Sequence, residues 1–505
     1  MIMAEPIIGI DLGTTNSCGA IAREGGEVTL IPYRGGEFTV PSVFAIDDKG
    51  HELVGYEAHR QWQLNPKRTI YGAKRLIGVS FNSELVHEMQ KRITYDIAPG
   101  EDDDVVACIG DKKMRTVDVS SRILQKIKEV ASTYLNQPIA KAVVTVPAYF
   151  NDRQRQAVHT AGKNAGLEIV SIINEPTAAA LAYGARKTMN ETVAVYDLGG
   201  GTFDISVIEI RDRVFEVKAT GGDVFLGGID FDSALIQYIL SDFQTARGID
   251  LSTDPIAMQR IRDMAERVKI DLSSRQEAPL SIPFIAMADG KPLDLTMIIR
   301  REELETLVVH LVDRTFDTCA KVLEDAKLTP AKIDQVLLVG GQTRMPLIQD
   351  RIAKFFGKTA SKGVHPDEAV AVGAALFAQS LSADSSLKVK LLDVLPMAIG
   401  IETAEGSLHR LFERNSAVPN QKQFTFTTHR DNQKDLAMRI FQGDSVASRD
   451  NTLLGEFTFT GIRPGPAGAV RVEVVFDVSA QGMLALHATD LDTGTEMKHT
   501  VTLGR

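Results

Sequence analysis

The sequence predicts an α/β protein made of two related lobes, followed by a compact all-β domain. A segment that runs from an apolar strand through an aspartate into a Gly/Thr turn occurs twice, at 8–17 and at 193–204. Strand-like and helix-like segments alternate up to about Ser380, which is typical of α/β proteins. Beyond Lys390 almost every segment is strand-like. A chain of 505 residues is also too long for a single core.

The duplicated segment carries the main chemical signal. It reads IGIDLGTTNS in the first copy and VAVYDLGGGTFD in the second. Two such loops that face each other offer two sets of backbone N–H groups to a phosphate chain. Asp11 and Asp197 supply one carboxylate from each loop for a hydrated Mg²⁺. We therefore expect two lobes that close on one nucleotide. The sequence contains no GxxxxGK[ST] segment, which excludes a P-loop NTPase.

Several helices in the α/β region carry their own boundary signals. One begins with the capping residues of Asn151-Asp-Arg-Gln and ends at Gly166. Another spans 174–184, with proline in its first turn and glycine at its exit. A third glycine turn follows the apolar strand at 336–344.

The segment 261–273 predicts a helix with two distinct faces. A row of apolar residues at helical spacing forms a buried stripe: Ile261, Met264/Ala265, Val268 and Leu272. A second row with the same spacing is polar: Arg262, Glu266, Lys269 and Ser273. The polar row is either a solvated face with ion pairs or a set of donors and acceptors for a ribose and a base.

The C-terminal region predicts a β-sandwich. Residues 470–478 alternate with period two, and strand-like segments follow at 483–489 and 497–503. The region comprises about 110 residues, a size typical of a sandwich. The preceding segment, 380–390, is rich in Ser, Asp and Lys, and its composition indicates a linker.

Composition and charge narrow the function classes. The net charge of −10 argues against a nucleic-acid surface. The cysteines Cys18, Cys108 and Cys319 are odd in number and widely spaced, which favours a reducing compartment over a disulfide framework. The N-terminus shows no signal-peptide pattern, and there is no apolar run long enough for a membrane span. We expect a cytoplasmic protein.

Long motifs give the chain a family resemblance. It resembles the 70-kDa heat-shock chaperones of the DnaK type, ATPases with the actin/hexokinase-like fold, across Ile7 to Leu503. The motifs that carry the resemblance are IGIDLGTTNS (8–17), AVVTVPAYFNDRQRQA (142–157), IINEPTAAALAYG (172–184), VYDLGGGTFDIS (195–206), LVGGQTRMP (338–346) and HPDEAVAVGAA (365–375). The resemblance implies a nucleotide-binding ATPase domain at 1–380, a linker at 381–394 and a peptide-binding β-sandwich at 395–505.

The resemblance also implies roles for individual residues, with ATP or ADP, Mg²⁺ and a candidate K⁺ as cofactors. The catalytic group is Lys74, Glu175, Thr202 and Asp204, and the metal group is Asp11 and Asp197. Phosphates would be held by Gly13, Thr14, Thr15, Asn16, Gly199, Gly200, Gly201 and Thr202. The nucleoside would be held by Glu266, Lys269, Ser273, Gly340, Gly341, Arg344 and Asp367. Without the motif, Lys74 reads more simply as a surface ammonium beside Arg75.

Other implied roles concern peptides and the communication between domains. Peptide-groove positions are Ile401, Thr403, Phe426, Leu436 and Met438, although Phe426 and Met438 fit core packing equally well. The relay in which a proline and a surface arginine report the nucleotide state corresponds to Pro147 and Arg155. The interdomain strand corresponds to Lys390, Leu391, Leu392 and Asp393. Unfolded polypeptides, a J-domain co-chaperone and a nucleotide exchange factor are the implied partners, with no nucleic acid and no membrane.

Four departures from the family pattern shape the expectations, the first being Ala404 and His429 at the positions that arch over the peptide groove, where the small Ala404 leaves the arch open. The chain ends at Arg505, before the helical lid, so we expect no lid and faster peptide release. Lys390 places an ammonium in an otherwise apolar linker strand, where it weakens coupling unless its head reaches water. Ser171 stands where relatives carry an arginine for J-domain partners.

The expected function is nucleotide-controlled binding and release of extended apolar peptides. Two other classes remain open. A small-molecule kinase of the same superfamily is disfavoured by the β-domain and the long chaperone motifs. An ATP-binding scaffold without coupled cycling is disfavoured by the intact set Asp11, Lys74, Glu175 and Asp197.

Overall fold

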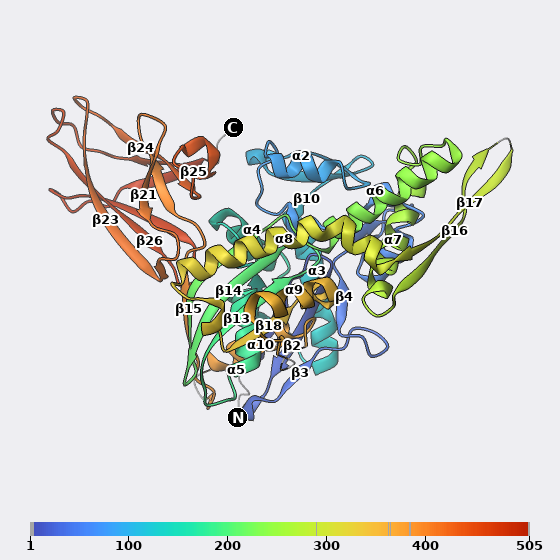
Figure 1. Cartoon of the computed structure of the whole chain (residues 1–505). Coiled ribbons are helices and arrows are strands. Elements are labelled where there is room, and N and C mark those ends of the chain that lie inside the picture. The colour runs from blue at the N-terminus through green and yellow to red at the C-terminus, as the bar shows by residue number, and fades with distance from the viewer. Residues whose placement is uncertain (1–4, 289, 362, 364, 383–384, 503–505) are drawn as a thin grey trace.

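The computed structural model describes residues 5–288, 290–361, 363, 365–382 and 385–502, and it shows a mixed α/β protein with several sheets (Figure 1). Residues 5–382, here called the α/β part, contain all the α-helices that the described residues form. Residues 395–502, here called the β part, lie at one end of the molecule and contain only strands and one short 3₁₀ turn.

Two six-stranded sheets repeat one strand arrangement; the first lies within the α/β part, and the second also takes in β19 after that part and β22 of the β part. In each, a strand that leads into a glycine loop pairs antiparallel with the strand after the loop and parallel with a third strand. The first sheet contains β1 (Ile7–Asp11), β2 (Asn16–Ala22), β3 (Val28–Leu30), β4 (Thr39–Pro41), β11 (Lys141–Val146) and β12 (Glu168–Asn174). The second contains β13 (Asn190–Leu198), β14 (Phe203–Arg211), β15 (Val214–Asp223), β18 (Gln335–Val339), β19 (Lys390–Val394) and β22 (Ala417–Val418).

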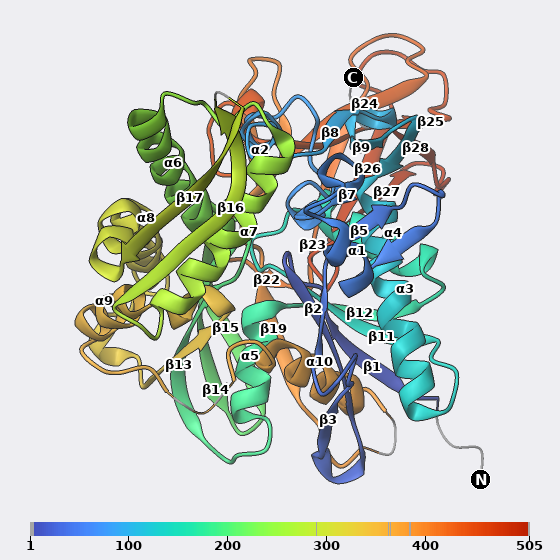
Figure 2. The same cartoon turned by 90° about the vertical axis from the view of Figure 1, so that its right-hand side faces the viewer.

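Two helices lie between these sheets and bring them together (Figure 2). They are α5 (Glu175–Gly184) and α10 (Ala369–Ser380), both rich in alanine and almost entirely buried. The close approach needs glycine on the strand side, because a Cβ on Gly9 of β1 would lie 2.2 Å from the backbone nitrogen of Ala375. Small residues therefore set the distance between the two halves of the α/β part.

Smaller sheets and further helices extend both halves. One half carries β5 (Phe44–Ile46), β6 (Glu52–Val54), β7 (Thr69–Ile70), β8 (Asp96–Pro99), β9 (Val105–Ile109), β10 (Lys112–Arg115), α1 (Tyr56–Gln61), α2 (Glu84–Gln90), α3 (Thr116–Leu135) and α4 (Asp152–Asn164). The other carries the hairpin β16 (Glu277–Ala288) and β17 (Lys291–Arg300), with α6 (Gly228–Arg247), α7 (Pro255–Leu272), α8 (Arg301–Asp325) and α9 (Pro346–Phe356).

The helix boundaries follow the expected capping signals. Asn151 caps α4, where its side chain accepts from Gln154 N–H while the Gln154 side chain accepts from Asn151 N–H. Asn174 occupies the N-cap position of α5, which has proline in its first turn. Helix α7 buries the predicted stripe of Ile261, Ala265, Val268 and Leu272. Within the described residues, no helix is both long and apolar enough to cross a membrane.

The β part consists of two antiparallel sheets around one shared core. The alternation predicted at 470–478 is confirmed, because every second residue of β26 (Arg471–Val478) is buried. Phe459 and Phe476 are fully buried in this core. The larger sheet holds β20 (Ile399–Glu402), β21 (Leu408–Phe412), β24 (Asp435–Gln442), β25 (Thr452–Thr460) and β28 (Lys498–Thr502), and the smaller one β23 (Asn420–Thr427), β26 and β27 (Leu484–Asp490).

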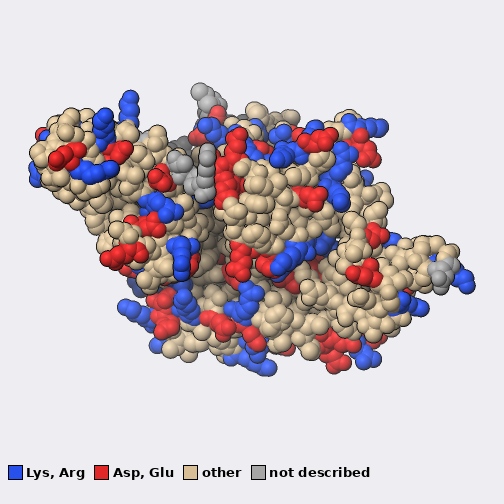
Figure 3. Space-filling model, turned by 90° about the horizontal axis from the view of Figure 1, so that it is seen from above, with Lys and Arg blue, Asp and Glu red and all other residues tan. Residues whose placement is uncertain are grey.

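Charged side chains of both signs cover the surface. Seen from above, basic and acidic groups intersperse over both parts (Figure 3), in keeping with a chain of 56 Lys and Arg and 66 Asp and Glu. A mixed surface of this kind favours solubility.

Candidate functional site

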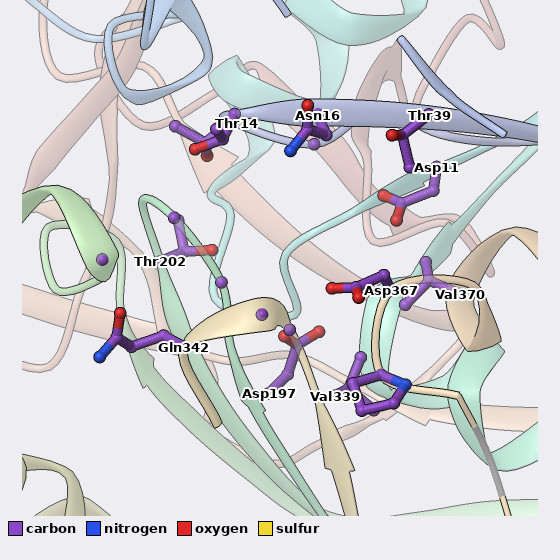
Figure 4. Close-up of a pocket in the computed structure, with 18 of the residues that line it drawn as sticks. Asp11, Thr14, Asn16, Thr39, Asp197, Thr202, Val339, Gln342, Asp367 and Val370 are labelled. Atoms are coloured by element: carbon purple, nitrogen blue, oxygen red, sulfur yellow. The ribbon is translucent and has the colours of Figure 1, made fainter. Parts of the chain in front are cut away.

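The two glycine loops face each other across a cleft between the halves of the α/β part. A Cβ on Gly200 would lie 2.0 Å from Thr15 Oγ1, and a Cβ on Gly201 would lie 2.5 Å from the Thr14 side chain. Only glycine fits at these two positions without moving the opposite loop. The cleft encloses a cavity of about 420 Å³, into which side chains from both loops point (Figure 4).

Most of the predicted site residues line this one cavity. They are Asp11, Gly13, Thr14, Thr15, Asn16, Lys74, Glu175, Asp197, Gly199, Gly200, Thr202, Glu266, Lys269, Ser273, Gly340, Gly341, Arg344 and Asp367. Gly201 and Asp204 do not line it, although Gly201 belongs to the second loop and Asp204 pairs with Asp197 across β13 and β14. The fold therefore brings predicted site residues that are more than 350 positions apart in the sequence to one cavity.

Buried carboxylates gather at the base of the cavity. Burial and the neighbouring charge of Glu175 raise the pKa of Asp11 to about 7 and that of Asp204 to about 7. Burial, followed by Glu175, Asp204 and Asp11, raises the pKa of Asp197 well above its ordinary value. Asp204 Oδ1 accepts from Tyr149 N–H at 3.1 Å, whereas the buried Oδ2 has no partner among the described residues. Crowded carboxylates of this kind gain from a nearby cation.

The donor set fits a water-clad divalent cation and a phosphate chain. Among the described residues, no three Asp, Glu, His or Cys side chains are grouped to ligate a metal directly. Asp11 and Asp197, one from each loop, could instead hold Mg²⁺ through its water shell, as this ion prefers. The orphaned Asp204 oxygen and the glycine cradle are the structural observations that support this fit.

Lys74 and Glu175 form an ion pair inside the cavity. Lys74 comes from the 3₁₀ turn at Ala73–Arg75, and Glu175 is the first residue of α5. Each is only 6% exposed, and Arg75 is 3% exposed, so the alternative of a surface basic stretch is wrong. Arg75 Nε donates to Gly201 O at 2.8 Å, and its guanidinium pairs with Asp230. The short turn therefore places one cation in the cavity and uses the next to fix the second loop.

The polar row of α7 is divided between two places. Glu266, Lys269 and Ser273 line the cavity beside the third glycine turn, whereas Arg262 lies next to the aromatic ring of Tyr71. Lys269 Nζ donates to Gly228 O at 3.1 Å and pairs with Asp232 at 2.8 Å. This end of α7 therefore directs its polar side chains into the cavity and is not a solvated surface face.

Sequence reasoning missed other lining residues, among them Gly228 and Gln342. Gly228 opens α6 directly after Gly227, where a Cβ would lie 2.5 Å from Gly201 N. A glycine pair before a helix was a usable signal for close backbone approach. Gln342 had no such signal, because its position depends on the turn that follows β18.

Of the residues predicted for communication between the parts, Arg155 contacts the β part. Pro147 is buried, and Arg155 is 3% exposed rather than on the surface as expected. The reason is coverage by the β part: the Arg155 guanidinium donates to Ala148 O, Phe150 O and Gln481 O. Asp393 is partly buried; its desolvation raises its pKa, and Thr177 Oγ1 donates to it at 3.1 Å.

The linker strand adds to the second sheet. In β19, Lys390, Leu391 and Leu392 pair in parallel with residues 214–216 of β15. Lys390 N–H donates to Arg213 O at 3.0 Å while the Lys390 side chain is exposed. The ammonium head therefore reaches water, so the lysine does not place a charge inside the apolar contact of the linker strand.

The peptide-groove candidates lie around the core of the β part. Ile401, Phe426 and Leu436 are half-buried against that core, and Met438 belongs to it. Thr403 follows β20 in a turn, where its hydroxyl contacts Ser407 Oγ at 2.8 Å. Core packing therefore accounts for Met438, whereas the partial exposure of the other apolar residues leaves surface for a ligand.

Taken together, the fold and site define a mixed α/β protein with a polar cleft between two halves, joined by a strand to a β part. Comparison with protein families matches residues 7–505 to the family described as Hsp70 protein. The chain belongs to the Hsp70 family. Members of this family are in general chaperones and ATPases that bind ATP or ADP with Mg²⁺.

Proposed function

We propose that this protein is an ATP-dependent chaperone in which hydrolysis in the α/β part controls peptide binding by the β part. In this proposal, two actin-like lobes to residue 380 bind the nucleotide, residues 381–394 link, and a sandwich from residue 395 binds peptides. The observation that carries the proposal is the convergence of both glycine loops, the Lys74–Glu175 pair and the buried carboxylates on one cavity.

The chain's own groups supply what phosphoryl transfer to water requires. Amides of the two loops and the hydroxyls of Thr14, Thr15 and Thr202 surround the place for the phosphates. Lys74 contributes a buried positive charge, and Glu175 accepts a hydrogen bond there, so the pair can orient a water molecule. Mg²⁺, held through water by Asp11 and Asp197, would neutralise phosphate charge.

Contacts between the two parts support control of the β part by the cleft. Tyr149 N–H donates to Asp204 in the site, and Arg155 lies on the same segment against the β part. Asp152 Oδ1 accepts from Leu484 N–H at 2.8 Å, and Asp152 N–H donates to Gln442 Oε1 at 2.9 Å. If ATP binding weakens peptide binding through these contacts, peptide must weaken ATP binding by the same factor.

Phosphate release with and without a saturating apolar peptide tests the proposal. We expect basal hydrolysis, stimulation by peptide, and loss of both in Lys74→Ala, with the exposed Lys67→Ala as the matched control. Peptide dissociation should also be faster with ATP than with ADP. Equal dissociation rates together with no stimulation would show that the chain binds nucleotide without a coupled cycle.

A further inference from the structure

Two buried serines hold the first glycine loop in place. Ser17 is the second residue of β2, and Ser42 directly follows β4, which pairs with β2. The side chains of both serines are buried. Neither serine lines the cavity of the cleft, so each can act on a ligand there only through the loop.

The two hydroxyls close a chain of hydrogen bonds on Gly13. Gly13 N–H donates to Ser17 Oγ at 3.2 Å, the two hydroxyl oxygens lie 2.9 Å apart, and Ser42 Oγ donates to Gly13 O at 2.8 Å. A serine hydroxyl has one hydrogen, and that of Ser42 is used on Gly13, so Ser17 must donate to Ser42. The chain therefore runs in one direction and fixes both backbone groups of Gly13. A Cβ on Gly13 would lie 1.9 Å from Asn16 O, so only glycine fits here.

This hydrogen-bond chain sets the direction of a neighbouring amide. Gly13 C=O and Thr14 N–H belong to one planar trans peptide group, so the two bonds point in opposite directions. Because the oxygen is held on Ser42, Thr14 N–H points away from Ser42. Ser42 N–H also donates to Thr15 O at 2.8 Å, which orients the next carbonyl but one in the same way. The residues that follow these two carbonyls, Thr14 and Asn16, line the cavity (Figure 4).

The second glycine loop has its carbonyl groups held in a similar manner. The oxygens of residues 199–201 accept, in turn, from Gly228 N–H, Ile229 N–H and Arg75 Nε, at 2.8 to 2.9 Å. The N–H groups of residues 200–202 therefore turn away from these donors. In both loops carbonyl groups are bound within the chain, which leaves the amide side for an anion. Only in the first loop do serine hydroxyls make these bonds.

We propose that Ser17 and Ser42 are positioning residues that keep the amides of the first glycine loop turned towards the phosphates of the nucleotide. This proposal rests on the proposed function, in which the phosphates occupy the cavity of the cleft. A loop whose carbonyl groups could turn into the cavity would set partial negative charge against the phosphates, whereas the held loop presents N–H groups. The serines act through the loop, so they affect the binding of phosphates and not that of the nucleoside.

Ser42→Ala tests the proposal, because it removes the hydroxyl and keeps the bond from Ser42 N–H to Thr15 O. Without the hydroxyl, the peptide group after Gly13 can turn, and a phosphate loses a charge-assisted hydrogen bond. We expect the affinity for Mg²⁺-ADP, measured by calorimetry, to fall about tenfold or more. The affinity for adenosine, which carries no phosphate, should stay within about twofold of the wild-type value. A merely structural role would change both affinities together.

Further variants provide the control and a graded result. Ser132→Ala is the matched control, because its hydroxyl also bonds one backbone N–H, at 3.1 Å, and one backbone C=O, at 2.8 Å, near the end of α3. It should leave the ratio of the two affinities unchanged. Ser17→Ala keeps the bond between Ser42 and Gly13, so it should weaken ADP binding less than Ser42→Ala does. If Ser42→Ala does not fold, Ser42→Cys keeps the volume, has only a weak donor and should show the same selective loss.

Hydrogen exchange in the nucleotide-free protein tests the hydrogen-bond chain without a ligand. The amides of residues 13–16 should exchange about tenfold faster in Ser42→Ala than in the wild type, and as in the wild type in Ser132→Ala. A folded Ser42→Ala protein that binds Mg²⁺-ADP as tightly as the wild type does, or whose loop exchanges no faster, overturns the proposal. A wild-type protein that does not bind Mg²⁺-ADP refutes the proposed function instead, and the exchange rates then decide whether the serines hold the loop.

Discussion

Asp152 makes the contact between the two parts dependent on pH. Its carboxylate is 7% exposed beneath the β part, where Oδ1 accepts from Leu484 N–H and Oδ2 accepts from Gln156 Nε2 at 3.2 Å. Burial raises its pKa to about 6, against an ordinary value of 3.8, which we expect it to approach when the parts separate. Association therefore takes up a proton. It is strongest below the ordinary pKa and weakens as the pH rises through about 6.

The magnitude follows from the two pKa values. At pH 7 the ionised carboxylate opposes association by about 3 kcal/mol, since each unit of difference corresponds to about 1.36 kcal/mol. Lowering the pH from 7 to 5 should recover about 1.3 kcal/mol, which is about a tenfold shift towards association. Asp393 is partly buried at the same junction and desolvation raises its pKa, so it acts in the same direction.

Asp152→Asn isolates the contribution of this carboxyl. The amide keeps an acceptor oxygen for Leu484 N–H and carries no charge, so association at pH 7 should strengthen. Energy transfer between dyes on exposed Thr133 and Arg430, in a Cys108→Ser background, measures the equilibrium. In the variant, the shift of the association equilibrium between pH 7 and pH 5 should be about tenfold smaller than in the wild type. Exposed Asp111→Asn should retain it. An unchanged pH profile in Asp152→Asn, or wild-type association that weakens on acidification, would refute the reasoning.

Three further changes test the cleft and the linker. Gly200→Ala places a Cβ 2.0 Å from Thr15 Oγ1, so nucleotide affinity by calorimetry should fall at least about tenfold. Arg155→Ala leaves three carbonyl oxygens without their donor, so peptide stimulation of phosphate release should disappear while the basal rate stays within about twofold. Lys390→Leu should change association by less than about 0.5 kcal/mol, whereas Leu391→Lys, which buries a charge, should cost about 2 kcal/mol or more in the same energy-transfer assay.

The parts of the site that could be predicted are those with a local chemical reason. A strand that ends in aspartate and enters a glycine turn shows the same signal wherever it occurs, so both loops were found from the sequence. The α7 stripe and the α4 cap were likewise local. Lys74 and Glu175 needed the family resemblance, because an isolated lysine or glutamate carries no signal of burial.

The parts that could not be predicted depend on which distant segments meet. Arginine is usually a surface residue, and the burial of Arg155 depends in part on Gln481 of the β part, more than 300 positions away. The surroundings of Trp62 and Tyr71 have the same origin, because the cavity that these residues line is also lined by residues of α6 and α7.

The second sheet explains how a lysine can stand in the linker without disrupting it. Its strand β13 ends at the second glycine loop, and β15, two strands further along the sheet, pairs with β19, so one sheet extends from the cleft to the linker. Backbone hydrogen bonds make this pairing, and they do not depend on the side chain of Lys390. Leu391 packs on the buried core instead, with Lys390 turned to water. When β19 leaves, β15 becomes an open edge, and a charged residue on the departing strand disfavours its pairing with other chains.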